Sequence, residues 1–293
     1  MTSTEIIPWN KKPLSHSTAD KISGCPECAR LSKTLKRESY FLHIVHVSKY
    51  VHTLIEQAGS NGPETLIDFS LIFQNIDEIV KHNIKEKKRI GSNARDMALD
   101  KLKALAKMYL THVHEQELYF GIMEYKIEHK MKGLDEHGEL LLNGNGKKMA
   151  VKGKPLELDF LGYVDRISVR ADGSMIAPWD WKLFQKKSPK VNPSHVSQLK
   201  RYCLCLHELG LIRLPAPAYL LYGYPVDPKF TDSPFQMQLH SFEFEIEELM
   251  VAKRQLFYID VIRRKGLSVA NHYYEYCKYC DYKDVCSIGD CII

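Results

Sequence analysis

The spacing of apolar residues divides the chain into helical and extended parts. Apolar residues recur every three or four positions over residues 38–57 and again over 93–113, which predicts two amphipathic helices. From about Tyr119 the spacing shortens to two, in short segments separated by Gly, Asn and Asp residues. This alternation predicts β-strands joined by turns, so we expect the chain to change from helical to extended structure near this residue.

Helical spacing returns in the second half of the chain. It predicts helices over residues 194–209 and 245–265, and the apolar run at 218–224 between them is typical of a buried strand. Strands followed by a helix, a strand and a second helix indicate an α/β fold. We expect three parts along the chain: a helical N-terminal region (1–118), an α/β core (119–240), and a C-terminal helix with its tail (241–293).

The composition is that of a globular protein with a hydrophobic core. Of the 293 residues, 44% are apolar and 26% are charged, which excludes a disordered or collagen-like chain. No apolar run reaches the roughly 18 residues that cross a bilayer, and the first residues lack the apolar stretch of a signal peptide, so we expect an intracellular, cytoplasmic protein. The net charge of +5 is too small to establish a nucleic-acid partner by itself.

Eight cysteines are unusual for an intracellular protein, because disulfides are rare in a reducing compartment. Cys203 and Cys205 belong to the predicted helix at 194–209, and we expect them to pack in the core because residues two apart on a helix point to different sides. Three others form a C-x2-C-x5-C run in a polar tail, a spacing typical of metal ligands. These three are Cys277, Cys280 and Cys286, and a fourth donor would have to be Cys25, Cys28 or Cys291.

Two kinds of metal site fit these cysteines. The ligands of a four-cysteine zinc site would be Cys25, Cys28, Cys277 and Cys280. The ligands of a [4Fe-4S] cluster would be Cys25, Cys277, Cys280 and Cys286. Either site joins residues about 250 positions apart, and closing such a loop costs about 5 kcal/mol of chain entropy. A metal here would therefore clamp the two ends of the fold together.

The strongest turn signal in the chain is Asp172-Gly173, because this pair suits the positive φ angles of a type I′ hairpin. A two-residue loop at this point places Asp165 directly opposite Asp180, with Lys182 on the same face. Two opposed carboxylates repel each other unless a cation lies between them, so the hairpin predicts a divalent metal at Asp165 and Asp180. Such a metal, with a lysine beside it, can hydrolyse a phosphodiester.

Three ordered motifs point to the same chemistry. They are Gly162-Tyr163-Val164-Asp165-Arg166, Asp180-Trp181-Lys182 and Gln198-Leu199-Lys200-Arg201-Tyr202. Together they resemble the G-x-x-D-R, D-x-K and Q-x3-Y motifs of RecB-like nucleases in the PD-(D/E)xK superfamily. The resemblance implies a restriction-endonuclease-like core, a mixed sheet flanked by helices, in a deoxyribonuclease that depends on Mg²⁺ or Mn²⁺.

The same resemblance assigns roles to single residues. Residues 48–56 are similar to a helix of the family that carries a metal-binding histidine, so His52 becomes the third metal ligand beside Asp165 and Asp180. Lys182 is expected to activate the attacking water. The residues expected to position the substrate are Gln198 and Tyr202.

The cysteines join this resemblance. The segment Ser15-His16-Ser17, followed by Gly24-Cys25-Pro26, is similar to the segment that supplies the first ligand of an iron-sulfur cluster in one branch of the family. This branch includes the AddB subunit and the iron-sulfur exonucleases of CRISPR adaptation and of viruses. Its other ligands come from a C-terminal C-x2-C-x5-C run. The resemblance thus implies a structural [4Fe-4S] cluster at Cys25, Cys277, Cys280 and Cys286, with Cys28 and Cys291 as bystanders.

Basic residues are concentrated beside these motifs. Residues 181–201 contain six Lys or Arg and no acid, which favours binding to the phosphates that flank a scissile bond. Tyr163, Trp179 and Trp181 are candidates for stacking on bases or for packing in the core.

Together these patterns support one hypothesis and two alternatives. The hypothesis is a metal-dependent DNA exonuclease with a [4Fe-4S] cluster, which acts on single-stranded DNA or DNA ends in replication, recombination or repair, in complex with other proteins. If the protein is viral, it would work in the host cytoplasm. The alternatives are a non-catalytic DNA-binding module of the same fold, and the same nuclease with a four-cysteine zinc site.

Overall fold

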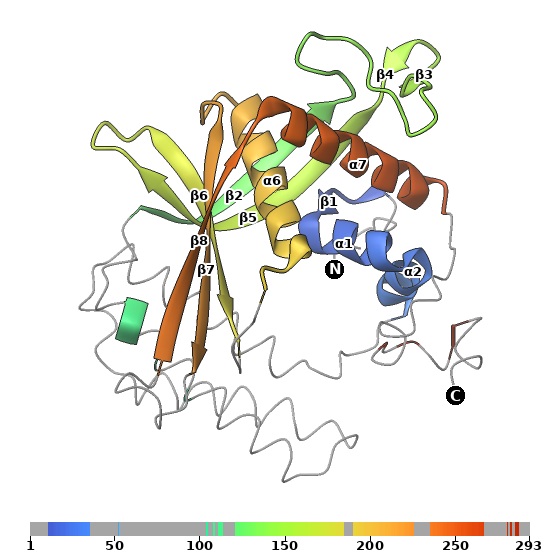
Figure 1. The fold of residues 1–293 in the computed structure, drawn as a ribbon. Coiled ribbons are helices and arrows are strands. Elements are labelled where there is room, and N and C mark those ends of the chain that lie inside the picture. The colour runs from blue at the N-terminus through green and yellow to red at the C-terminus, as the bar shows by residue number, and fades with distance from the viewer. Residues whose placement is uncertain are drawn as a thin grey trace, which may run out of the picture.

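The computed structural model describes residues 11–35, 52, 104, 108, 111–113, 121–184, 190–225, 235–266, 280, 282, 285 and 286. These residues form a mixed sheet with helices packed against it (Figure 1). The strands are β1 (Leu14–Ser15), β2 (Ile122–Lys132), β3 (Ala150–Val151), β4 (Lys154–Pro155), β5 (Glu157–Val169), β6 (Met175–Leu183), β7 (Ala216–Pro225) and β8 (Phe235–Phe244). The helices are α1 (His16–Gly24), α2 (Pro26–Thr34), α6 (Pro193–Glu208) and α7 (Ile246–Arg264).

The main sheet has the order β1-β5-β6-β7-β8 within the described residues, and β2 pairs with β5. β1 runs parallel to β5 and β6 runs parallel to β7, while the other neighbours are antiparallel. The predicted α/β fold is therefore confirmed, with a mixed sheet that is consistent with a restriction-endonuclease-like core. None of the helices in the described part of the chain is long and apolar enough to cross a bilayer.

Helix α6 covers the centre of the sheet and carries one of the motifs (Figure 1). It begins after Asn192, whose side chain accepts the N–H of Ser194, and it ends before Gly210, which has a positive φ of 72°. Cys203 and Cys205 are both fully buried on this helix, so the expectation that they pack in the core is confirmed. The helices predicted over 194–209 and 245–265 correspond to α6 and α7.

The β5–β6 hairpin has the predicted register near the site, but not the predicted turn. The loop has three residues, because the N–H of Arg170 donates to the carbonyl of Ser174, and Gly173 takes a positive φ of 80°. An extra residue in β6, Ile176, then shifts the pairing by one position, since Val169 pairs with Met175 and Ser168 pairs with Ala177. The two departures cancel. Arg166 therefore pairs with Trp179, as expected, immediately before the positions of Asp165 and Asp180.

Two predicted helices fall largely outside the described residues. Of the first, over 38–57, the structure describes only His52, which is helical. Of the second, over 93–113, it describes Ala104, Met108 and residues 111–113, all of them helical, and Val113 is buried. The prediction is consistent with the structure at these positions.

Candidate metal centre

Strands β5 and β6 bring Asp165, Asp180 and Lys182 together at the centre of the sheet. The carboxylate of Asp165 reaches across to β6 and accepts the backbone N–H of Trp181 at 2.7 Å. Asp180 is fully buried, and Nζ of Lys182 lies 2.8 Å from each of its two carboxylate oxygens. The convergence of two carboxylates and one ammonium that the hairpin register predicted is therefore present.

Burial and charge act in opposite directions on this pair. Burial raises the pKa of Asp180, and the negative charge of Asp165 raises it further, while Lys182 lowers it. Burial also lowers the pKa of Lys182, but the carboxylates of Asp180 and Asp165 outweigh this effect and raise it. Lys182 therefore carries its positive charge at neutral pH.

Glu124 is a site residue that the sequence interpretation missed. It lies on β2 opposite Asp165, between the pairs Met123–Arg166 and Tyr125–Val164. Its φ of +46° is unusual for a residue with a side chain, and the pairing of β2 with β5 is interrupted at this position. No motif marks Glu124, because its position opposite Asp165 depends on the register between β2 and β5, which are joined by the long turn-rich segment 133–156.

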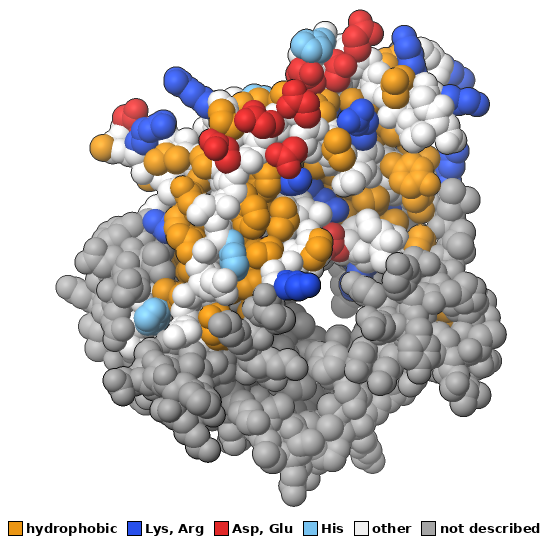
Figure 2. Space-filling view, in the orientation of Figure 1, with side chains coloured by type: hydrophobic (Ala, Val, Ile, Leu, Met, Phe, Trp, Pro, Cys, Tyr) orange, Lys and Arg blue, Asp and Glu red, His pale blue; other side chains and the backbone are white. Residues whose placement is uncertain are grey.

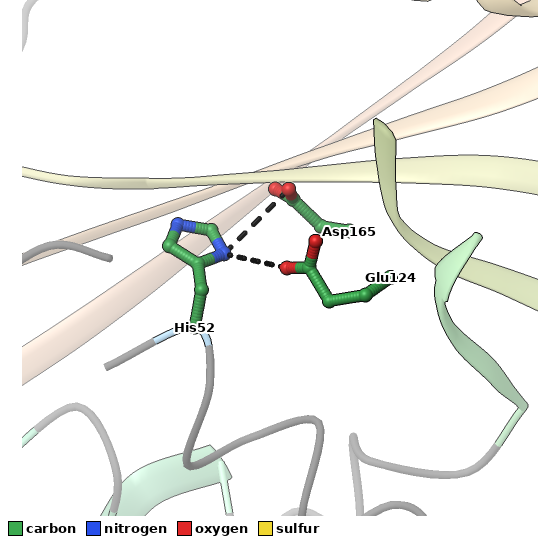
Figure 3. A group of neighbouring side chains, drawn as sticks. All are labelled: His52, Glu124 and Asp165. Carbon is green, nitrogen blue, oxygen red and sulfur yellow. Dashed lines mark ion pairs between the residues drawn. The ribbon is translucent and has the colours of Figure 1, made fainter. Parts of the chain in front are cut away.

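His52 completes a group of three possible metal ligands with Glu124 and Asp165 (Figure 3). Nδ1 of His52 is 3.5 Å from a carboxylate oxygen of each acid. The three ligand atoms all lie within 4.8 Å of one another, which is close enough for a single ion to contact all three. Burial lowers the pKa of His52, but Asp165 and the hydrogen bond with Glu124 outweigh it and raise the pKa to about 8.

The donor set fits a divalent metal ion. One imidazole nitrogen and several carboxylate oxygens suit Mn²⁺, and the carboxylates suit Mg²⁺ as well. Within the described residues, the grouped ligand atoms come from His52, Glu124 and Asp165, while the carboxylate of Asp180 is turned toward Lys182. The Oδ2 atom of Asp180 is buried without a well-oriented hydrogen bond from any described residue, so it has lone-pair capacity for a cation.

Gln198 and Tyr202 hold the strand that carries Asp165. The hydroxyl of Tyr202 donates to the carbonyl of Tyr163 at 2.5 Å, and the side-chain amide of Gln198 donates to that hydroxyl at 2.8 Å. Burial raises the pKa of Tyr202 well above its ordinary value, so its O–H remains a donor. A Cβ atom at Gly162 would lie 2.9 Å from the ring of Tyr202, which explains why glycine stands here. Two of the sequence motifs are therefore in direct contact.

The basic run at 181–201 is less available to DNA than its sequence suggests. Arg201 is 4% exposed, and it donates to Asp20 at 2.8 Å and to His16 at 2.6 Å, both on α1. Lys200 forms an ion pair with Glu248 at 2.8 Å, and Lys182 is paired with Asp180. The expectation that the whole run contacts phosphates is wrong for Arg201, because this side chain is buried between two helices. Lys186 and Lys187 lie outside the described residues.

The three candidate stacking residues have different environments. Trp181 is buried, so it packs in the core. Trp179 stacks on Tyr219 with 4.4 Å between ring centroids, and the guanidinium of Arg166 lies 4.8 Å from its ring. Tyr163 is 51% exposed, and it is the one of the three that solvent reaches most easily. It remains the candidate for contact with a base.

The structure brings an N-terminal and a C-terminal cysteine into contact, and the N-terminal one is Cys28. The Sγ atoms of Cys28 and Cys280 are 3.6 Å apart, while Sγ of Cys25 accepts the backbone N–H of Cys28 at 3.4 Å. The hydrogen bond with Cys280, together with burial, raises the pKa of the Cys28 thiol. The expected assignment, with Cys25 as a ligand and Cys28 as a bystander, stays a prediction. Cys277 and Cys291 lie outside the described residues.

Comparisons with known proteins identify the family to which this chain is similar. A model of the PD-(D/E)XK nuclease superfamily matches residues 13–287. A search of curated protein sequences finds no significant match. Among solved structures, the chain is similar to the one described as "Crystal structure of SSO0001", with a TM-score of 0.37 and 15% identity over 68% of this chain and 78% of that chain.

Proposed function

Because the chain belongs to the PD-(D/E)XK nuclease superfamily, whose members are typically metal-dependent nucleases, we propose that it is a deoxyribonuclease that removes nucleotides from DNA ends. The observation that carries this proposal is the group of His52, Glu124 and Asp165 beside the buried pair of Asp180 and Lys182. An imidazole and several carboxylates can hold a metal ion for phosphodiester hydrolysis, and an ammonium beside them can stabilise the negative charge that develops.

The acidic side chains and the histidine would hold the metal, with Mg²⁺ or Mn²⁺ as the ion. A bound ion of this kind polarises the phosphodiester and lowers the pKa of a water molecule. Glu124 and Asp165 face His52 from two paired strands, so the sheet fixes their separation. Asp180, which is paired with Lys182, would be a further carboxylate available to the ion.

Lys182 would act as a cation during the reaction. Because its pKa is raised, it keeps its proton and suits the stabilisation of negative charge that develops on the phosphate, as well as the orientation of the attacking water. Asp180 holds Nζ of Lys182 at 2.8 Å, so the position of the ammonium within the site is restrained. Gln198 and Tyr202 contribute indirectly, by fixing the strand that carries Asp165.

The charge on one face of the molecule suggests where DNA would not bind. In Figure 2 acidic side chains gather at the end of the molecule where α7 begins. Glu243, Glu245 and Glu247 lie exposed in this stretch. Phosphates are repelled by such a surface, so we expect DNA to approach the site from elsewhere.

The resemblance to the iron-sulfur branch supports a [4Fe-4S] cluster at the terminal cysteines, and a four-cysteine zinc site is the alternative. The same resemblance supports DNA replication, recombination or repair as the process, with other proteins of such a complex as partners. The contact between Cys28 and Cys280 supports a metal that joins these two distant segments of the chain.

The test is a DNA cleavage assay with anaerobically purified protein, with Mg²⁺, Mn²⁺ or a chelator. End-labelled single-stranded and double-stranded DNA should be shortened from the ends, and covalently closed circular DNA should stay intact. Asp165→Ala and Lys182→Ala should abolish cleavage, while Asp172→Asn, an exposed carboxylate at the turn of the same hairpin, should cleave normally.

The outcomes separate the proposal from its rivals. Cleavage of the circle would replace the exonuclease by an endonuclease. Tight DNA binding without cleavage under any metal condition would favour a non-catalytic DNA-binding module. Full activity of Asp165→Ala would show that this site is not the catalytic one.

A further inference from the structure

The two ends of the described chain meet at a pair of cysteines. Cys28 and Cys280 are 252 positions apart in the sequence, and their Sγ atoms are 3.6 Å apart. Cys28 lies in the first turn of α2, and Cys280 comes after the end of α7. A thiol is a weak hydrogen-bond donor, so an S–H···S contact alone contributes little to holding a polar tail at this place.

Cys25 has a different environment from Cys28. It is the residue before the first turn of α2, and its sulfur accepts the N–H of Cys28, one of the backbone groups at a helix start that lack a partner within the helix. Its side chain is 8% exposed, whereas Cys28 is only half-buried. Within the described residues, no three cysteine sulfurs lie within 4.8 Å of one another, so a single ion could not contact Cys25, Cys28 and Cys280 together at these positions.

We propose that Cys28, and not Cys25, supplies the N-terminal thiolate of a metal centre that it shares with Cys280. Cys25 acts instead as the N-cap of α2 and orients the first turn that carries Cys28. The inference concerns the cysteine centre of the proposed function and is independent of catalysis. Two thiolates on one tetrahedral ion with metal–sulfur bonds of about 2.3 Å lie about 3.8 Å apart, so the observed separation suits a single ion. In a cubane cluster each cysteine binds a different iron, and the two sulfurs would have to move apart.

A matched pair of serine substitutions tests this assignment. Serine is a good N-cap, so Cys25→Ser keeps the helix start and removes only the sulfur. We expect Cys25→Ser and the control Cys203→Ala, in the buried face of α6, to retain metal, and Cys28→Ser to lose it by about tenfold or more. The measurement is zinc, iron and acid-labile sulfide per chain after anaerobic purification. Zinc alone identifies a single ion, whereas iron with sulfide identifies a cluster. In both cases, metal loss in Cys28→Ser together with metal retention in Cys25→Ser supports Cys28 as the ligand.

A second measurement uses the unmodified protein and does not depend on the folding of a variant. Site-resolved alkylation with iodoacetamide should leave Cys28 and Cys280 protected until the metal is removed, and should modify both of them afterwards. The proposal is overturned by wild-type metal content in Cys28→Ser, by equal loss in Cys25→Ser, by a disulfide between Cys28 and Cys280, or by protein without metal. A loss of DNA cleavage with unchanged metal content would bear on the nuclease proposal alone.

Discussion

The backbone of Glu124 has an unfavourable positive φ angle at the candidate metal centre. A residue with a side chain at positive φ costs about 1–3 kcal/mol relative to an ordinary strand conformation. The neighbouring pairs of β2 and β5 continue undisturbed on both sides of Glu124, so the strain is confined to one position. What the molecule gains there is a carboxylate 3.5 Å from His52 and next to Asp165.

A first prediction follows for Glu124→Gln. The amide keeps the shape of the side chain but removes a negative charge from the donor set, so the Mg²⁺ or Mn²⁺ concentration needed for half-maximal DNA cleavage should rise by about tenfold or more. A metal titration of the cleavage rate measures this. Glu128→Gln is the matched control, since Glu128 lies on the same strand with its side chain 68% exposed. An unchanged metal requirement in Glu124→Gln would remove this residue from the metal centre.

At the scale of elements, the contact between β5 and α6 shows why two distant motifs occur together. Gly162 leaves room for the ring of Tyr202, and the Tyr202 hydroxyl then reaches the carbonyl of Tyr163. Gly162 of one motif and Tyr202 of the other are thus in direct contact. The contact lies on the part of β5 just before Asp165. Their sequence signals are separate, but their structural role is shared.

We therefore predict that Gly162→Ala destabilises the protein. The added Cβ would lie 2.9 Å from the Tyr202 ring and 3.0 Å from the Phe160 ring, and relieving such overpacking costs about 1–3 kcal/mol. Urea unfolding measures the loss, and DNA cleavage should fall as well because Asp165 moves with its strand. Gly144→Ala is the control, since no atom lies within 4 Å of a Cβ at that position. Equal stability of the two variants would contradict the packing argument.

The contact between α6 and β7 leads to a prediction about pH. Burial lowers the pKa of His195 to about 4, and the positive charge of Lys182 adds to this. The neutral imidazole interacts with the hydroxyl of Tyr222 at 2.8 Å through Nδ1. In the unfolded chain its pKa is about 6.5, so the unfolded chain takes up the proton first as the pH falls. The free energy of unfolding should therefore decrease between about pH 6.5 and pH 4.

Chemical unfolding in the presence of a chelator, repeated across this pH range, measures that decrease. His195→Gln should show a shallower dependence on pH than the unmodified protein. His137→Gln, at an exposed histidine, should keep the full dependence. The argument fails if His195→Gln and the unmodified protein lose stability equally over this range. Asp20 contributes at lower pH, because hydrogen bonds and the charge of His16 outweigh its burial and hold its pKa well below the ordinary range.

At the scale of the whole molecule, polar contacts fasten the N-terminal segment to the helices that pack on the sheet. Arg201 on α6 binds Asp20 and His16 on α1, and Ser194 also donates to Asp20. Near the C-terminal end of α7, Arg263 is paired with Asp260 and donates to the carbonyl of Lys12. The N-terminal segment is thus connected to both helices that cover the sheet.

Breaking the buried contact should cost far more than breaking its exposed neighbour. Arg201→Met leaves the half-buried Asp20 without its guanidinium partner, and we expect a loss of about 1.5–3 kcal/mol in the free energy of unfolding. Lys200→Met, one position away, removes the more exposed pair with Glu248 and should cost less than about 1 kcal/mol. Similar losses in the two variants, measured by urea unfolding, would refute the structural role assigned to Arg201.

These cases show which parts of the site could be predicted from the sequence. The register that places Asp165 near Asp180 was predicted correctly, although the turn was not, because the bulge at Ile176 compensates for the longer loop. Glu124 could not be found, since its place depends on pairing across a long segment. Arg201 was read as a DNA contact because sequence shows its charge but not its burial between two helices. Local patterns thus predicted strands and helices, while contacts between distant segments needed the structure.

The shortest strand of the sheet has a consequence for any attempt to isolate the catalytic core. β1 consists of Leu14 and Ser15, and it pairs with Phe160 and Leu161 on the part of β5 that β6 does not reach. A fragment that starts at residue 119 would leave these backbone groups of β5 open to solvent. Unpaired strands of this kind recruit other chains and aggregate. Strand β1 therefore protects this stretch of β5 from pairing with another chain.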